Sequence, residues 1–170
     1  MAKTLLITTD DIKKFTPIGG NVDTDKIIPL LITEQDTNIQ SLLGTELLEK
    51  VQSDIDASTL TGEYATLVND YVKPTLYWGA FSIYLSFAPF TIGNGGLYQH
   101  RSENSDSVSL DDAQRLAKIA RDKANYYRER CEDYLCFKQS ELPEYNQNTN
   151  EDVYPTRGAG MPYPGGFQLD

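Results

Sequence analysis

Few side chains in this sequence combine a residue type and a spacing that catalysis requires. The chain holds a single histidine, His100, beside a run rich in serine. A general base there would need a nucleophile to activate, as in acyl transfer. No serine or cysteine stands in the short elbow motif that such nucleophiles occupy. We therefore interpret His100 as an exposed loop residue and predict no catalytic residue.

Metal and cofactor sites are also not indicated. Cys131 and Cys136 are separated by five positions in a predicted helix, so they point about 140° apart and cannot pair with each other. One histidine and two cysteines do not complete a zinc site. The run 21–25 imitates the start of a calcium loop, but Lys26 replaces its glycine and Ile32 its bidentate glutamate. We expect no metal and no cofactor.

Charged residues follow patterns typical of structure. Asp10-Asp11 and Asp111-Asp112 fall at predicted helix starts, where the helix dipole favours acids. Gly93 to Gly96 lacks the lysine of a phosphate loop and reads as a turn. The last predicted helix is rich in lysine and arginine, but interleaved acids, as in Asp111 and Arg115, form pairs at i,i+4. This favours a solvated face, or one that pairs with a neighbouring subunit, over a nucleic-acid stripe.

The net charge and the length of the uncharged stretch limit which binding partners and which membrane roles the sequence favours. The net charge of −10 disfavours DNA and anionic membranes as binding partners. Residues 74–90 carry no charge, but the stretch is short for a membrane span and contains Pro74 and Pro89, so we interpret it as a central helix buried on all sides. The first residues contain too short an apolar run for a signal peptide, and we expect synthesis in the host cytoplasm.

Helices account for most of residues 1–138, which we predict to form one helical domain. A short helix capped by Thr8 or Thr9 runs to about Phe15, and a longer one, capped by Asp23 or Asp25 with Pro29 in its first turn, runs to Gly44. Thr45 is expected to cap the next helix. Two further helical regions complete the domain: residues 63–90, which Pro74 must kink or break, and residues 109–138, whose apolar stripe includes Leu116.

A hairpin and a loop over residues 91–107 interrupt these helices. Asn94-Gly95 supplies the positive φ angles of a tight turn, and the following polar run reads as a loop. Ser109 and Asp112 form a capping box for the last helix.

Residues 139–170 form an extended tail rich in proline and glycine, with no helical or strand period. Such a composition is typical of segments that do not fold alone. We expect the tail to dock on another surface, that of a neighbouring chain. The residues predicted to contact a neighbouring subunit or partner are Asn94, Gly95, Gly96, Tyr98, Tyr145, Tyr154, Met161, Tyr163 and Phe167.

Several short motifs occur in a characteristic order over roughly residues 4–138. They are Leu6 to Phe15, the corner Leu43-Gly44-Thr45, the run Tyr71-Val72-Lys73-Pro74, and Asn94-Gly95-Gly96 followed by Ser102-Glu103-Asn104-Ser105. In these motifs the chain resembles the head–tail connector (adaptor, or ring) proteins of tailed bacteriophages, and most closely those of Bacteroidetes phages, including the crAss-like phages.

The resemblance implies a mainly α structural protein of the virion, a connector-type helical bundle with a small β-hairpin and the long C-terminal tail. Such subunits form a homo-oligomeric ring, usually a dodecamer, at the portal vertex. The ring links head and tail, extends the DNA channel and contacts the portal protein and adjacent ring or tail proteins. An acidic lumen would let packaged DNA slide without specific binding. The tail extends beyond the simplest connectors, which end soon after their last helix.

Two other functions stay open at this point. A small acidic inhibitor that mimics DNA and binds a host protein would suit the net charge of −10, although bases concentrate on the last helix. An enzyme that uses His100 would require a pocket around the hairpin, and no substrate class presents itself. We expect a structural protein and no enzyme.

Overall fold

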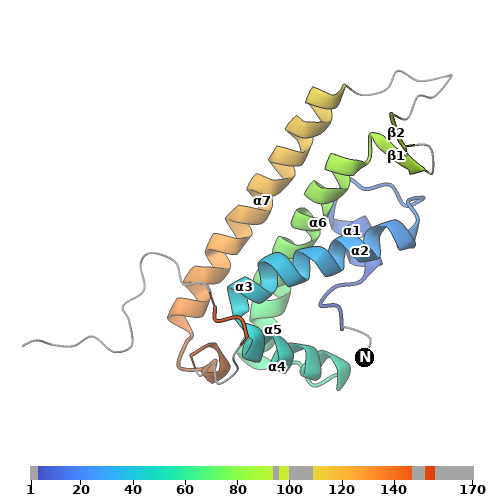
Figure 1. Cartoon of the computed structure of the whole chain (residues 1–170). Helices are drawn as coiled ribbons and strands as arrows, with labels where there is room; N and C mark the ends of the chain where they lie inside the picture. Colours follow the sequence, from blue (N-terminus) through green and yellow to red (C-terminus); the bar gives the residue numbers. More distant parts are fainter. Residues whose placement is uncertain (1–3, 94–95, 100–108, 147–151, 156–170) are drawn as a thin grey trace, which may run out of the picture.

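The chain folds as an arrangement of helices with one long helix along its side (Figure 1). The computed structural model describes residues 4–93, 96–99, 109–146 and 152–155. The mainly α prediction is confirmed. The elements are α1 (Thr9–Phe15), α2 (Thr24–Glu34), the π-helical η1 (Gln35–Ile39), α3 (Gln40–Leu43), α4 (Thr45–Asp56), α5 (Gly62–Thr66), the π-helical η2 (Leu67–Val72), α6 (Lys73–Phe87), β1 (Phe90–Gly93), β2 (Gly96–Gln99), α7 (Leu110–Phe137) and the 3₁₀ turn η3 (Pro143–Tyr145).

Helices α6 and α7 pack along each other and form the centre of the fold. The face that α7 turns toward α6 carries small buried residues, Ala113, Ala117, Ala120 and Ala124, which let two helix backbones approach closely. Ser82 Oγ on α6 donates a hydrogen bond of 2.9 Å to the Ala117 carbonyl on α7. The predicted alanine stripe therefore forms this helix–helix contact.

Helix caps follow the sequence closely. Thr8 caps α1 in a capping box with Asp11, and Ser109 Oγ accepts a hydrogen bond from the Asp112 amide at the start of α7. Both caps are as predicted. Each satisfies one of the amides that a helix leaves unpaired at its N-terminus.

Helix α2 continues through η1 into α3 without a break and ends at Gly44, as predicted. The N-cap position is Asp23, one of the two predicted caps, although its side chain makes no capping hydrogen bond. Because α2 begins at Thr24, Pro29 lies inside the helix and not in its first turn, where it was predicted. A proline there removes one backbone hydrogen bond, and the helix tolerates this loss within a long packed element. The π turn at 35–39 inserts an extra residue per turn and rotates the buried face, which then includes Glu34 and Gln35.

A second helical element runs from α5 through η2 into α6. Pro74 does not break this element, contrary to one of the predicted alternatives. Pro74 lies in the first turn of α6, and the π turn over Leu67–Val72, directly before α6, accommodates it. Helix α6 is buried along one side as far as Ser82: Leu76 and Ala80 are also buried, whereas Trp78 is half-buried and Phe87 is exposed. The prediction of a helix buried on all sides was therefore wrong.

The strands β1 and β2 pair antiparallel, with Phe90 opposite Gln99 and Gly93 opposite Gly96. The predicted turn residues Asn94 and Gly95, His100 and the loop 101–107 lie outside the described residues. Within the described helices, none is both long and apolar enough to cross a membrane.

A buried ion pair joins α2 to both central helices. Glu34 on α2 is 1% exposed, and its Oε1 lies 2.8 Å from Arg121 Nη1 on α7. Arg121 Nη2 also donates to the Gly79 carbonyl on α6 over 3.4 Å. The Glu34 side chain occupies the space where a β-carbon on residue 79 would stand. Gly79 is therefore required for α2 to approach α6.

Gly79→Ala should lower the free energy of unfolding by about 1–3 kcal/mol, because the new methyl group overpacks against a buried carboxylate. Denaturant titration followed by circular dichroism measures the change. Gly20→Ala is the matched control, since a β-carbon at Gly20 meets nothing within 4 Å. Equal effects of the two substitutions would contradict the close approach at Gly79.

Candidate assembly surfaces

No catalytic constellation is found among the residues that the structure describes. They contain no group of three or more His, Cys, Asp or Glu side chains able to hold a metal ion. Cys131 is buried and Cys136 half-buried. Burial raises the pKa of the Cys131 thiol well above its ordinary value, which keeps it protonated and unreactive. We therefore turn to the contacts that the C-terminal residues make with the helices, and to the apolar surfaces that α6 and α7 expose.

The chain after α7 packs on its own helical body. Leu142 and Tyr145, near and within η3, are fully buried in the same hydrophobic core as α4 and α6. Tyr64 Oη donates a 2.6 Å hydrogen bond to Glu144 Oε2, and burial together with this carboxylate raises the pKa of Tyr64. The sequence-based boundary at 138/139 thus cuts through the core. Tyr145, predicted to contact a partner, fills its own chain's core, because its apolar ring adds burial that the short α4 and α5 need.

Residues 152–155, the C-terminal anchor, lie on the corner between α3 and α4. The Thr45 amide donates to the Val153 carbonyl over 3.0 Å, and the Val153 amide donates back to Thr45 Oγ1 over 3.2 Å. Asp152 Oδ2 accepts from Thr45 Oγ1 at 3.0 Å and from Gln40 Nε2 at 3.2 Å. The prediction that Thr45 caps α4 was wrong. Thr45 is the first residue of α4, and the N-cap position is Gly44, which has no side chain that could form a capping hydrogen bond.

The C-terminal anchor takes over the role of that missing cap. The Val153 carbonyl satisfies the first amide of α4, and the Asp152 carboxylate lies at a helix N-terminus, where the dipole favours a negative charge. A segment more than one hundred positions away in sequence thus completes α4.

Gly44 makes room for the anchor. Its φ of 77° lies in the region that favours glycine, and an added β-carbon would stand 2.6 Å from Pro155 Cδ. Pro155 is buried, whereas Tyr154 beside it is half exposed.

A polar cluster joins α5 to the end of α7. The Glu63 carboxylate accepts hydrogen bonds from the Tyr134 hydroxyl and, over 3.1 Å, from Lys138 Nζ. Lys138 Nζ also lies 3.0 Å from Glu141 Oε1. These donors, Tyr134 first, lower the pKa of Glu63, and the Glu141 and Glu63 carboxylates raise the pKa of Lys138.

One side of α7 exposes large apolar side chains to solvent. We name it the α7 outer face; it consists of Leu116, Ile119, Tyr126 and Phe137. Their spacings of three, seven and eleven bring them to one side of a helix. Leu116, predicted in the buried stripe, is 49% exposed, and Tyr126 is 56% exposed.

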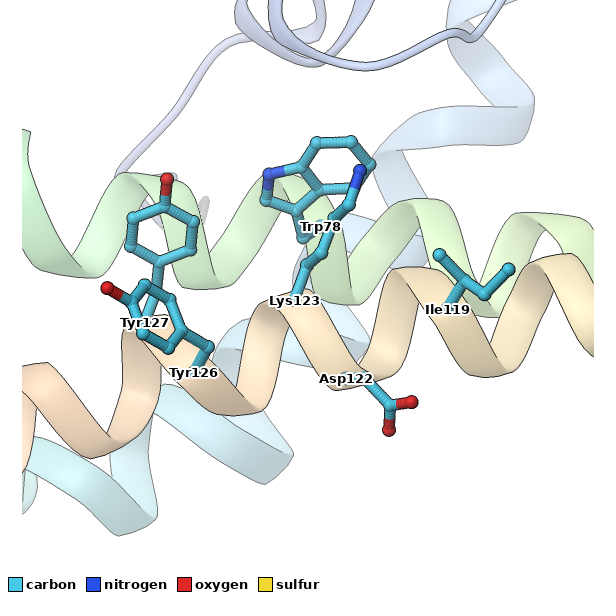
Figure 2. A pocket seen from close by; sticks show the side chains of 6 residues that line it. All are labelled: Trp78, Ile119, Asp122, Lys123, Tyr126 and Tyr127. Carbon is cyan, nitrogen blue, oxygen red and sulfur yellow. The ribbon is translucent and has the colours of Figure 1, made fainter.

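A shallow groove of about 510 Å³ lies between α6 and α7 and shares Ile119 and Tyr126 with this face; we name it the aromatic groove (Figure 2). It is lined by Trp78 from α6 and by Ile119, Asp122, Lys123, Tyr126 and Tyr127 from α7. Lys123 Nζ lies 3.9 Å from the centre of the Trp78 ring, a cation–π contact, while Asp122 points away from that ring. The groove is predominantly apolar, with charges at its rim.

The basic residues of α7 are distributed over several contacts. Arg121 binds Glu34, Lys123 covers Trp78, and Lys138 binds Glu63. Arg128 Nε lies 3.4 Å from Glu132 Oε1. The predicted i,i+4 pair of Asp111 and Arg115 is not among the ion pairs of the described residues, and the prediction of a face that pairs with a neighbouring subunit stays untested.

Sequence reasoning missed both the aromatic groove and the α7 outer face. A signal was present, since Ile119 and Tyr126 fall on the polar side of the predicted stripe at heptad spacing. Of the other predicted contacts, Gly96 and Tyr98 belong to β2, and Asn94, Gly95, Met161, Tyr163 and Phe167 lie outside the described residues.

Gly44→Ala should destabilise the chain more than Gly62→Ala does, by about 1–3 kcal/mol. Both glycines have positive φ, but only Gly44 faces Pro155, while Gly62 faces open space. The difference therefore isolates the anchor contact from backbone strain. Denaturant titration gives the free energies, and faster proteolysis after residue 146 in Gly44→Ala would report the released anchor. Equal losses in both variants would argue against the anchor.

Glu63→Gln should lower the denaturation midpoint at neutral pH. A carboxylate with a lowered folded-state pKa stabilises the fold above its ordinary value of 4.5, and this contribution disappears as the pH falls through the lowered value. The midpoints of wild type and variant should therefore converge in acid. Glu49→Gln, on an exposed position of α4, should leave the midpoint unchanged. A gap that persists in acid would exclude the charge as its cause.

Comparison with known proteins places the chain in a family but assigns it no activity. A family model described as a family of unknown function (DUF6712) matches residues 39–154, from the end of η1 through α7 to the C-terminal anchor. No curated protein and no solved structure matches the chain. Because the match spans well over half of the sequence, the chain belongs to this family of unknown function, DUF6712.

Proposed function

We propose that this chain is a structural subunit of a bacteriophage head–tail connector, forming a ring at the portal vertex that extends the DNA channel from head to tail. The observation that carries the proposal is the α7 outer face. Four large apolar side chains lie exposed on one side of the longest described helix. Large apolar side chains exposed on one side of a helix favour burial against another chain.

The sequence supports a partner that is another copy of the same chain. Motifs over residues 4–138 resemble those of connector proteins, which are ring subunits, usually in dodecamers. Closed rings use head-to-tail contacts between two different surfaces of each subunit. The α7 outer face provides one such surface, and the exposed Tyr154 beside the C-terminal anchor provides a candidate for the other.

Net charge supports the proposed channel. A chain with a charge of −10 gives a ring whose summed charge repels phosphate, so DNA would pass without being held. Several basic side chains of α7 contact carboxylates or aromatic rings, which works against a continuous DNA-binding stripe.

Native mass spectrometry of the full chain, alone and with the phage portal protein, tests the proposal. A discrete high-order ring in either condition is expected, and portal-dependent formation would identify the portal protein as its template. A monomer in both conditions would contradict the connector function and favour the acidic inhibitor, for which capture of a specific host protein is the next measurement.

Leu116→Glu should abolish or strongly reduce ring formation while leaving the helical circular dichroism spectrum unchanged. Leu116 is half exposed, so a charge there costs the monomer little but is costly inside an apolar interface. Asn125→Glu adds the same charge at an exposed position of α7 and serves as the control. Rings that form equally in both variants would show that the α7 outer face is not the interface.

A further inference from the structure

We propose that the aromatic groove of one subunit binds the segment 161–167 of a neighbouring copy. The inference rests on the proposed ring, in which copies lie side by side, and it names the surface and the segment that join them. It concerns the groove between α6 and α7, which is distinct from the Gly44 corner that binds the C-terminal anchor.

The groove and the segment have matching chemistry. Trp78, Tyr126 and Tyr127 present three rings from two helices, and Ile119 adds an apolar floor. Grooves lined by aromatic rings bind proline-rich peptides in the extended polyproline conformation. The segment reads Met161-Pro162-Tyr163-Pro164-Gly165-Gly166-Phe167, with two prolines that restrict φ and lower the entropic cost of binding.

Charge does not oppose the pairing. After Pro155 the chain carries one base and one acid, Arg157 and Asp170, and the groove rim carries one of each sign, Asp122 and Lys123. The remaining residues on both sides are predominantly apolar or aromatic, so association buries apolar surface without leaving an excess of unpaired charge.

The position of the anchor favours a neighbour's groove over the chain's own. Arg121 reaches Glu34 of α2, whereas Lys123 covers Trp78 at the groove. Side chains two positions apart on a helix point about 160° apart, so α2 and the groove lie on opposite sides of the α6–α7 pair. Pro155 packs on Gly44 at the end of the α2–α3 helix, on the α2 side.

The length of the chain beyond the anchor fits an exchange between adjacent subunits. Five residues separate Pro155 from Met161, and six peptide units reach about 20 Å when extended. That distance is about twice the 8–10 Å between the axes of packed helices, which is enough to reach a subunit packed against this one. To reach its own groove, the chain would have to pass around α6 or α7 first.

Disulfide trapping tests the pairing in the full chain. Asp122→Cys places a thiol at the groove rim and Gln168→Cys places one beside Phe167, both in a Cys136→Ser background; Cys131 stays, because it is buried. Mild oxidation should give covalent multimers on a non-reducing gel. Asp25→Cys with Gln168→Cys is the control, since Asp25 is exposed on α2, on the other side of the α6–α7 pair from the groove. We expect about tenfold more multimer in the groove pair, because docking raises the local thiol concentration.

Native mass spectrometry of the same variants shows whether rings form, and the disulfide yields are interpreted together with that result. An internally linked monomer would overturn the exchange between subunits, and equal multimer yields in both pairs would overturn the specificity of the groove. Rings without disulfide trapping would sink the groove assignment and leave the connector proposal standing. A chain that forms no ring would contradict both.

Fluorescence provides a second readout, because Trp78 is the single tryptophan of the chain. In assembled rings, Tyr163→Ser with Phe167→Ser should shift Trp78 emission to longer wavelength, since the indole would lose its apolar cover. Phe87→Ser, at an exposed position of α6 nine residues after Trp78, is the matched control and should leave the emission unchanged. An unchanged emission maximum in the tail variant, with rings intact, would place the segment elsewhere.

Discussion

The buried carboxylate of Glu34 constrains how the helices of this chain are arranged. It binds Arg121 of α7 and rests on Gly79 of α6, so three elements far apart in sequence meet at one point. Buried ion pairs add little net stability relative to apolar contacts, but they are costly to break, because the remaining charge is left without its partner. Sliding α2 along the α6–α7 pair would separate these charges. The ion pair therefore specifies the position of α2, and the absence of a side chain at Gly79 makes this position accessible.

That position determines which surfaces face outward. With α2 on one side of the α6–α7 pair, the aromatic groove and the α7 outer face remain uncovered. The same helix, continued through η1 and α3, delivers Gly44 to the corner where Pro155 packs. One interaction thus orients both a surface available to another chain and the point from which the C-terminal residues depart. This coupling is the structural basis for relating the groove to the tail.

Local patterns in the sequence predicted the local features well. The Thr8 and Ser109 caps, the end of α3 at Gly44 and the alanine stripe of α7 each depend on neighbours within a turn or two. The errors arise where contacts between residues far apart in the sequence determine which side chains are buried. Tyr145 is buried because residues 142–145, after α7, fill core volume beside α4 and α5. Glu34 is buried because Arg121 on α7 pairs with its carboxylate. Neither partner is visible in a helical period, and the period alone also assigns Leu116 to the buried side of α7, although the structure leaves it half exposed.

Anchoring residues 152–155 within the subunit changes what an exchange with a neighbour requires. If the whole chain after α7 were tethered only at Phe137, ordering it would cost backbone entropy along its entire length at the moment of assembly. Because Leu142, Tyr145 and Pro155 are packed in the subunit, the entropy cost of placing them belongs to folding, and the proposed exchange involves only residues after Pro155. A shorter tether also holds segment 161–167 at a higher effective concentration near an adjacent groove. A weak contact between a short proline-rich segment and a shallow groove then suffices to join subunits, since it is repeated around the proposed ring and each repeat begins from a fixed point of departure.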